Sequence, residues 1–316
     1  STHILTFATS AFFAIYSASK IMVEEKKTYR GNCRCAAFIF EVTIPEIKEV
    51  EICKCSICYK KNYAFLFVDK EDFRVIKGSM EDFTTYTFGE GIMKHNFCPK
   101  CSIMTACTHD KFPDQYVVNA RSLQGPVDIW NIPKKVDPGK AHKPDYIPPD
   151  DSDLAEPTAE IEGESKTYHG SCHCGDIRVK LKMEPVEKFK GTIGECNCSL
   201  CHRSGVTWIY SNRSQVTISP EWSSDKFSMY GEAGAKLGEQ YFCKRCGVYV
   251  ANRVRAVESD EEFAKLPEET QAFLADKRQW QPLNLRIFDG IDVDSDQVHV
   301  ERFDGYNQIK PEYVNP

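Results

Sequence analysis

Seven cysteines occur twice along this chain of 316 residues, in the same order and at nearly the same spacing. In each copy a C-x-C pair is followed by a C-x-C-x-x-C motif and then by a C-x-x-C pair. The first copy consists of Cys33, Cys35, Cys53, Cys55, Cys58, Cys98 and Cys101. The second consists of Cys172, Cys174, Cys196, Cys198, Cys201, Cys243 and Cys246, which leaves only Cys107 outside the pattern. Four thiolates complete a tetrahedral zinc site, whereas three leave one position open.

Disulfide bonds are the alternative explanation for so many cysteines, and the pattern disfavours them. The chain has 15 cysteines in 316 residues, below the roughly 8–10% that is typical of disulfide scaffolds. Cysteines two positions apart, as in both C-x-C pairs, would make a strained bridge. Zinc thiolate sites fit the spacing and the softness of the ligands better. We therefore expect a reducing compartment and a cytoplasmic protein.

The repeat extends beyond cysteine and predicts a duplicated domain. Residues 29–35 (YRGNCRC) parallel residues 168–174 (YHGSCHC), and the tetrapeptides at 118–121 and 283–286 also correspond. A proline-rich, acidic stretch lies between the copies. We expect four parts, namely an apolar N-terminal extension at 1–24, a zinc domain at 25–132, a linker at 133–165 and a second zinc domain at 166–316.

Within each copy the pattern predicts β-structure. Short apolar or alternating runs read as strands, at residues 36–42, 64–68, 177–181 and 206–210. The sequence thus predicts a mainly β protein of two zinc-stapled antiparallel sheet domains. A helical insertion is expected only in the second copy, over residues 258–278, with an interruption at Pro267.

Composition excludes some partners. The formal net charge is -6, and 41% of residues are hydrophobic. This is not the basic footprint of a nucleic-acid-binding protein. The apolar run at residues 4–16 is shorter than the roughly 20 residues that span a bilayer. It lacks the positive flank of a secretory signal, so we expect a packed or loose extension and no membrane partner.

The cysteine spacing suggests a division of labour within each copy. The simplest assignment joins the first and last motifs into a closed four-sulfur site and leaves the middle motif with an open zinc. Such a zinc lowers the pKa of a water or thiol that binds to it. The alternative is that the middle motif recruits a fourth protein ligand. His202 follows Cys201 directly, but Tyr59 stands at the matching position of the first copy.

At these residues the chain resembles the glutathione-dependent formaldehyde-activating enzyme family, also called the centromere protein V/GFA family. The family pattern is G-x-C-x-C-G, then C-x-C-S-x-C, then F-C-x-x-C-G. The second copy matches it throughout, whereas the first has Ala36 and Ser102 in place of two glycines. The resemblance covers about residues 28–131 and 166–306, and the tandem form is similar to duplicated versions found in fungi.

The resemblance implies a β-tent fold with two zinc ions per domain. It also implies a carbon–sulfur lyase that joins glutathione, as co-substrate, to formaldehyde or a related small carbonyl. The ligands of the open zinc would be the catalytic residues, with Cys196, Cys198 and Cys201 ranked first and Cys53, Cys55 and Cys58 second. The second copy ranks first because alanine and serine resist the positive φ that a glycine adopts after such a motif.

Other functions stay open from sequence alone. The chain could be a non-catalytic zinc module that binds a protein, or a tailoring lyase of a specialised metabolite. A C-x-C-x-x-C motif that has lost its zinc ion could also form a reversible disulfide. Two further groups of residues are candidates for a substrate pocket. Phe65, Phe67, Trp208 and Tyr210 could form its wall or belong to the core. Asn119, Arg121, Asn284 and Arg286 could bind carboxylates of glutathione or make structural hydrogen bonds.

Overall fold

The computed structural model describes residues 24–125, 127–139, 145–231, 238–253, 258–309 and 312–316. The expected N-terminal extension therefore lies, apart from Glu24, outside the described residues. Among the described residues no helix has the length and apolar character needed to cross a bilayer.

The first domain contains a three-stranded sheet and a seven-stranded sheet. The small sheet has the order β1-β2-β5, and the large one has the order β10-β3-β4-β9-β8-β7-β6. The strands are β1 (Lys26–Asn32), β2 (Ile39–Pro45), β3 (Val50–Cys53), β4 (Phe65–Asp69), β5 (Phe73–Lys77), β6 (Thr84–Tyr86), β7 (Met93–Phe97), β8 (Ala106–His109), β9 (Gln115–Asn119) and β10 (Lys134–Asp137). One short helix, α1 (Ser56–Lys61), follows β3.

The second domain repeats this arrangement element by element. Its small sheet has the order β11-β12-β15, and its large sheet has the order β16-β17-β18-β19-β14-β13-β20. The strands are β11 (Lys166–Ser171), β12 (Arg178–Met183), β13 (Ile193–Cys196), β14 (Trp208–Asn212), β15 (Val216–Ser219), β16 (Phe227–Tyr230), β17 (Glu239–Cys243), β18 (Tyr249–Arg253), β19 (Trp280–Asn284) and β20 (Glu301–Phe303). The helix that corresponds to α1 is α2 (Ser199–Ser204), and α5 (Gly305–Gln308) follows β20. The prediction of a mainly β, duplicated fold is confirmed.

Each large sheet is mixed rather than purely antiparallel. β10 pairs in parallel with β3 in the first domain, and β20 pairs in parallel with β13 in the second. β10 lies inside the stretch that we expected to be linker. Each of these strands runs beside the strand that ends at the first cysteine of the middle motif, because Asp137 is opposite Cys53 and Phe303 is opposite Cys196. The chain that follows β10 or β20 is thereby directed onto the three-cysteine motif.

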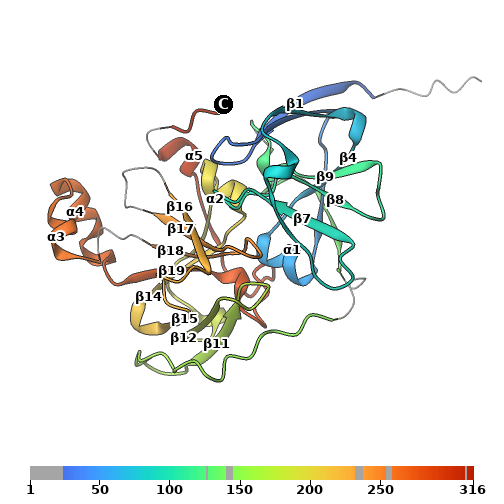
Figure 1. The fold of residues 1–316 in the computed structure, drawn as a ribbon. Coiled ribbons are helices and arrows are strands. Elements are labelled where there is room, and N and C mark those ends of the chain that lie inside the picture. The colour runs from blue at the N-terminus through green and yellow to red at the C-terminus, as the bar shows by residue number, and fades with distance from the viewer. Residues whose placement is uncertain (1–23, 126, 140–144, 232–237, 254–257, 310–311) are drawn as a thin grey trace, which may run out of the picture.

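Residues 145–165 of the linker lie along the second domain (Figure 1). The backbone N–H of Ala159 donates to the carbonyl of Ser214 at 2.9 Å. The Lys180 ammonium donates to the carbonyl of Leu154 at 2.8 Å, and the Leu154 side chain is buried. The segment is thus anchored to the domain by backbone groups and by an apolar contact.

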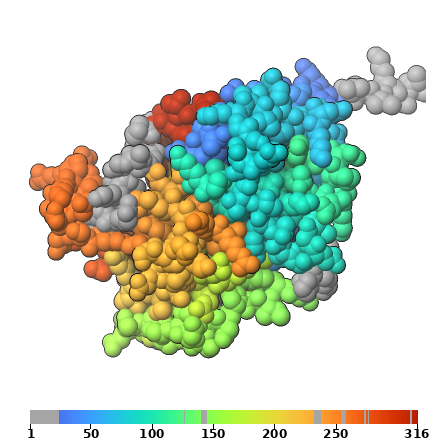
Figure 2. Space-filling model, in the orientation of Figure 1, coloured from blue at the N-terminus to red at the C-terminus, as the bar shows by residue number. Residues whose placement is uncertain are grey.

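The helical insertion of the second domain consists of two helices, α3 (Asp260–Ala264) and α4 (Glu268–Leu274). Pro267 is the N-cap of α4, so the predicted interruption is confirmed. Figures 1 and 2 show both helices at the outer margin of the second domain, away from the first domain. Their position does not suit a cap over a site between the domains.

The two domains contact each other through α1 and α2, and the contacts that the two helices make correspond to each other. From α1, the Lys60 ammonium donates to the carbonyls of Ser171 at 3.2 Å and Ile287 at 2.7 Å. From α2, the Arg203 Nε donates to the carbonyl of Asn32 at 3.2 Å. Ser171 and Asn32 directly precede the first C-x-C motif of their domains. Each helix therefore reaches across to the four-cysteine motif of the other domain.

The two glycine replacements in the first copy occupy strained backbone positions. Ala36 has a φ of 58° and Ser102 a φ of 51°. The matching Gly175 and Gly247 have φ values of 81° and 67°. A left-handed conformation costs a residue with a Cβ roughly 1–2 kcal/mol. The expected strain in the first copy is therefore present in the structure.

Replacing Ala36 by glycine should stabilise the protein. Relief of the left-handed strain outweighs the roughly 0.4–1 kcal/mol that glycine adds to the entropy of the unfolded chain. We expect a net gain of about 0.5–1 kcal/mol in the free energy of unfolding, measured by urea titration. The neighbouring exposed Ala37, whose φ is not positive, is the control. Ala37→Gly should lower stability, and equal losses in both variants would contradict the prediction.

Candidate metal centres

The structure brings four sulfurs together in each domain. One group joins the first and last motifs of the first domain, and the other joins those of the second. In each group all Sγ atoms lie within 4.8 Å of one another. The members are Cys33, Cys35, Cys98 and Cys101, and then Cys172, Cys174, Cys243 and Cys246.

The geometry of these groups fits zinc thiolate. The Cys33–Cys35 sulfur separation is 3.6 Å and the Cys35–Cys98 separation is 3.5 Å. The second domain has the same values, 3.6 and 3.5 Å, for its corresponding pairs. A tetrahedron of sulfurs at about 2.3 Å from zinc has edges of roughly 3.8 Å. All of the cysteines are free thiols in the structure, so the sulfurs are not joined as disulfides.

Three sulfurs come together at each middle motif, where a strand ends and a helix begins. In the second domain Cys196 ends β13, Cys198 is the N-cap of α2, and Cys201 lies within the helix. The Cys198 N–H points to the Cys196 sulfur at 3.3 Å, and the Cys201 N–H points to the Cys198 sulfur at 3.5 Å. Hydrogen bonds from Cys196 and Cys201 lower the pKa of the Cys198 thiol to about 2. The loop thus favours the thiolate at Cys198, the form that binds zinc, whereas hydrogen bonds within the cluster raise the pKa of Cys196 and Cys201.

The first domain has an equivalent cluster of Cys53, Cys55 and Cys58. Hydrogen bonds from Cys53 and Cys58 lower the pKa of the Cys55 thiol to about 4. Among the described residues, no histidine, aspartate or glutamate brings a ligand atom into either three-cysteine cluster. The alternative in which His202 completes the ligand set therefore finds no support in the geometry.

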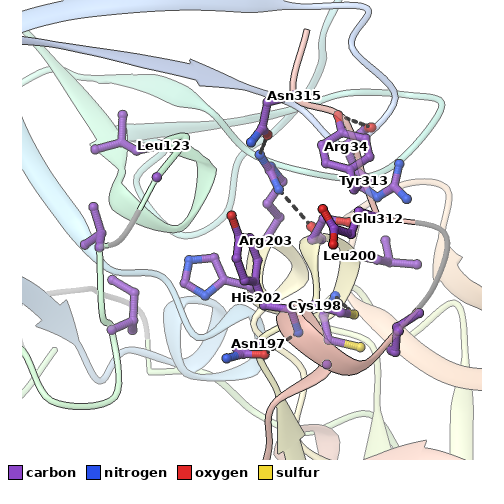
Figure 3. A pocket seen from close by; sticks show the side chains of 18 of the residues that line it. Arg34, Leu123, Asn197, Cys198, Leu200, His202, Arg203, Glu312, Tyr313 and Asn315 are labelled. Carbon is purple, nitrogen blue, oxygen red and sulfur yellow. Dashed lines mark hydrogen bonds between the residues drawn. The ribbon is translucent and has the colours of Figure 1, made fainter.

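The two three-cysteine clusters differ in their access to solvent. Cys53, Cys55 and Cys58 are buried, whereas the three cysteines of the second domain are partly exposed. Cys198 and Cys201 lie on the wall of a cavity of about 680 Å³ between the domains (Figure 3). A cavity of this size is within the range of small-molecule sites.

Tyr59 closes the corresponding space in the first domain. Its hydroxyl donates to the carbonyl of Ile291 at 2.8 Å and accepts from the N–H of Val293 at 2.9 Å. Lys54, from the same motif, forms an ion pair with Asp294. A segment of the second domain is thereby held over the first three-cysteine cluster. In the second domain His202 replaces Tyr59 and lines the open cavity.

A glycine lies directly on each three-cysteine cluster, and sequence reasoning missed both. A Cβ on Gly305 would lie 2.4 Å from the Cys196 sulfur, and a Cβ on Gly139 would lie 2.2 Å from the Cys55 nitrogen. Each glycine is the second residue after its strand, β20 or β10. The signal that could have found them is this recurrence of glycine at matching positions of the two copies.

The segment that contains Gly305 is held over the cluster by the middle motif itself. The Asn197 side chain donates to the Asp304 carboxylate at 2.9 Å and accepts from the Tyr306 N–H at 2.8 Å. Asn197 lies between Cys196 and Cys198 in the sequence. The motif and α5 are therefore positioned together.

Cationic side chains lie at another part of the cavity wall. Arg203 donates to the Asn315 side chain at 2.9 Å. The Arg34 guanidinium carbon lies 4.0 Å from the centre of the Tyr313 ring, and the Tyr313 hydroxyl donates to the Arg34 carbonyl at 3.0 Å. Figure 3 shows these side chains grouped on the side of the cavity that residues 312–316 approach. Glu312 lines the same part of the cavity, so this part of the wall is charged rather than apolar.

The aromatic side chains that we considered as a pocket wall do not line the cavity. Phe65 and Trp208 are buried in the core, as the alternative interpretation holds. Phe67 is exposed and packs against Phe112, whereas Tyr210 packs against Trp280.

The asparagine and arginine pairs have structural partners. The Arg121 Nε donates to the carbonyl of Asn62 at 2.7 Å, and Asn119 caps the turn that follows β9. Arg286 is buried and donates to the Asp294 carboxylate at 2.7 Å. These contacts use the guanidinium groups inside the protein and at the domain interface, so the structural interpretation fits them better than substrate binding does.

These features define a class of protein, a duplicated β domain with cysteine clusters suited to zinc. The family model described as "Glutathione-dependent formaldehyde-activating enzyme" matches residues 28–139 and 167–288. These two matches cover most of the chain, and the chain belongs to this family. A crystal structure of a Rhodobacter sphaeroides protein is also similar, with 32% sequence identity over 34% of this chain and 99% of that chain. Its TM-score of 0.31 is too low for an argument from that structure.

The close approach of Gly305 to Cys196 makes a specific prediction. In Gly305→Ala the added methyl group should displace the segment or the sulfur, and the metal content should fall by about one zinc per chain, measured by elemental analysis. Gly194→Ala is a matched control two residues before Cys196. A Cβ there would meet its nearest neighbour at an ordinary 3.6 Å. Unchanged metal content in Gly305→Ala would refute the assigned contact.

Proposed function

We propose that this protein is a zinc-dependent carbon–sulfur lyase that acts on glutathione adducts of formaldehyde or a related small carbonyl. The observation that carries the proposal is the cluster of Cys196, Cys198 and Cys201, three sulfurs beside a cavity with no fourth ligand among the described residues. Family membership supports the same chemistry. The free thiols fit a reducing, cytoplasmic setting.

The proposed reaction forms one bond and moves one proton. The sulfur of a thiol bonds to the carbonyl carbon, the thiol proton moves to the carbonyl oxygen, and no oxidant is required. The reverse reaction breaks the same carbon–sulfur bond. Cys196, Cys198 and Cys201 would hold the zinc ion, which would act as a Lewis acid and lower the pKa of a bound thiol.

Protein side chains around the cluster have separate tasks in this proposal. Gln240 donates to the Cys201 sulfur at 3.4 Å and so steadies one thiolate ligand. Arg34, Arg203 and Glu312 line the part of the cavity at which we place the peptide portion of glutathione. Gly305 leaves room for the segment that covers Cys196.

We propose further that each chain has one working site. The sequence ranked the second copy first because of Ala36 and Ser102, and the structure adds an independent reason. Tyr59 and the second domain cover the cluster of Cys53, Cys55 and Cys58, so a peptide-sized thiol has no access to it. The first cluster then serves as a structural metal site at the domain interface.

Substitution of the central cysteine in each cluster separates the two roles. We expect Cys198→Ser to lower turnover of glutathione plus formaldehyde by ~100-fold or more, because it removes a ligand from the working site. The matched variant Cys55→Ser should retain turnover when folded and lower the thermal midpoint instead. Both variants should lose about one zinc per chain.

The measurements are steady-state turnover, metal content and thermal unfolding of the same preparations. Equal loss of turnover in both variants would contradict a single working site. Four zinc ions per chain without turnover in the wild type would reject the formaldehyde reaction and favour a non-catalytic zinc module.

A further inference from the structure

The first domain supplies an apolar wall to the cavity of the second domain's cluster. The wall residues follow β9 in the first domain and line the cavity together with Cys198 and Cys201. They are Leu123, Val127, Ile129 and Trp130. Figure 3 shows Leu123 across the cavity from Cys198 and Leu200. The site of one domain is therefore completed by the other.

Hydrogen bonds and packing hold this wall in place. The Trp130 indole N–H donates to the Glu195 carboxylate of the second domain at 3.0 Å. The Arg302 guanidinium lies 5.5 Å from the centre of the Trp130 ring. Ile129 is 2% exposed and belongs to a small core cluster, whereas Val127 is partly exposed. The wall is thus preorganised before a ligand binds.

The other half of the molecule provides an internal comparison. There the corresponding segment of the second domain contacts Tyr59 and places Asp292 and Asp294 near Lys54. The segment with Asp292 and Asp294 carries more negative charge than the wall segment of the first domain. It is also bonded to Lys54 and Tyr59 at the first middle motif. Among the described residues, the segment of the first domain presents apolar side chains to a cavity that Cys198 and Cys201 also line.

We propose that the first domain is the specificity wall of the second domain's site, and that the preferred substrate is a thiol adduct whose carbonyl-derived part is bulky and apolar. This inference rests on the proposed function and names its substrate class. A one-carbon adduct has no surface to place against Val127 and Trp130, whereas an aryl or branched alkyl group does. The reaction is the same carbon–sulfur bond formation and cleavage, with the proton moving between sulfur and oxygen.

Thioethers of glutathione are not cleaved in this reaction, so their binding affinities test the specificity wall separately from turnover. Calorimetric titration of the zinc-loaded full chain would compare S-benzylglutathione with S-methylglutathione. Burial of about 55 Å² of additional apolar surface at roughly 25 cal/mol per Å² corresponds to about tenfold tighter binding of the benzyl compound. We expect Val127→Ser to reduce this preference to about threefold or less. The control Val136→Ser removes the same methyl groups from an exposed strand position in β10 and should leave the preference unchanged.

A parallel turnover assay separates failure of the wall from failure of the proposed function. We expect kcat/KM with glutathione plus 3-phenylpropanal to exceed that with formaldehyde, and Val127→Ser to lower the former more. If the protein turns over substrate but binds the two thioethers equally, the specificity wall is contradicted and the lyase activity is retained. If the protein binds S-benzylglutathione tenfold more tightly than S-methylglutathione but turns over neither aldehyde, the specificity wall is supported and the lyase activity is rejected. Trp130→Ala is a second variant, and its thermal midpoint shows whether it folds. If Val127→Ser and Trp130→Ala both keep the preference for the benzyl thioether, the specificity wall is contradicted.

Discussion

The rest of the structure depends on the contact of α1 and α2 with the four-cysteine motifs of the opposite domains. Lys60 and Lys61 of α1 are buried in this interface, and burial lowers the pKa of Lys61 to about 8. A buried cation is costly unless negative charge compensates it. A zinc ion with four thiolates carries a formal charge of -2, and the thiolates of Cys243 and Cys246 favour the charged form of Lys61. A zinc ion bound by the four cysteines of one domain would therefore stabilise the packing of the other domain against it.

This shared interface explains how a duplicated chain acquires two unequal sites. The same pseudo-symmetric contact places a segment of each domain over the other's three-cysteine cluster. Tyr59 bonds to its covering segment through two backbone groups, and the shorter His202 lines an open cavity instead. The longer side chain, Tyr59, lies at the buried cluster of the first domain, and the shorter one, His202, lies at the accessible cluster of the second domain. After the duplication, residues of the first domain thus line the cavity beside the three-cysteine cluster of the second domain.

The fold and the ligand groups were largely predictable, because they depend on short-range patterns. Alternating apolar residues predicted four of the strands, β2, β4, β12 and β14, to within a few residues, and Pro267 divides the helical insertion as expected. The pocket walls were not predictable. Trp208 was a candidate for the wall or the core and lies in the core, whereas no sequence pattern selected Trp130, which lines the cavity. A strand pattern shows which residues share a face, but it does not show what that face meets.

The sequence by itself determined the four sulfur groups and the strained positions at Ala36 and Ser102. Both follow from spacing within a few residues and from local backbone conformation. Only the tertiary structure decided which three-cysteine cluster is accessible. That depends on contacts between residues far apart in the chain, such as Tyr59 with Ile291 and Trp130 with Glu195. Such contacts arise when two complete domains pack together, and no local pattern records them.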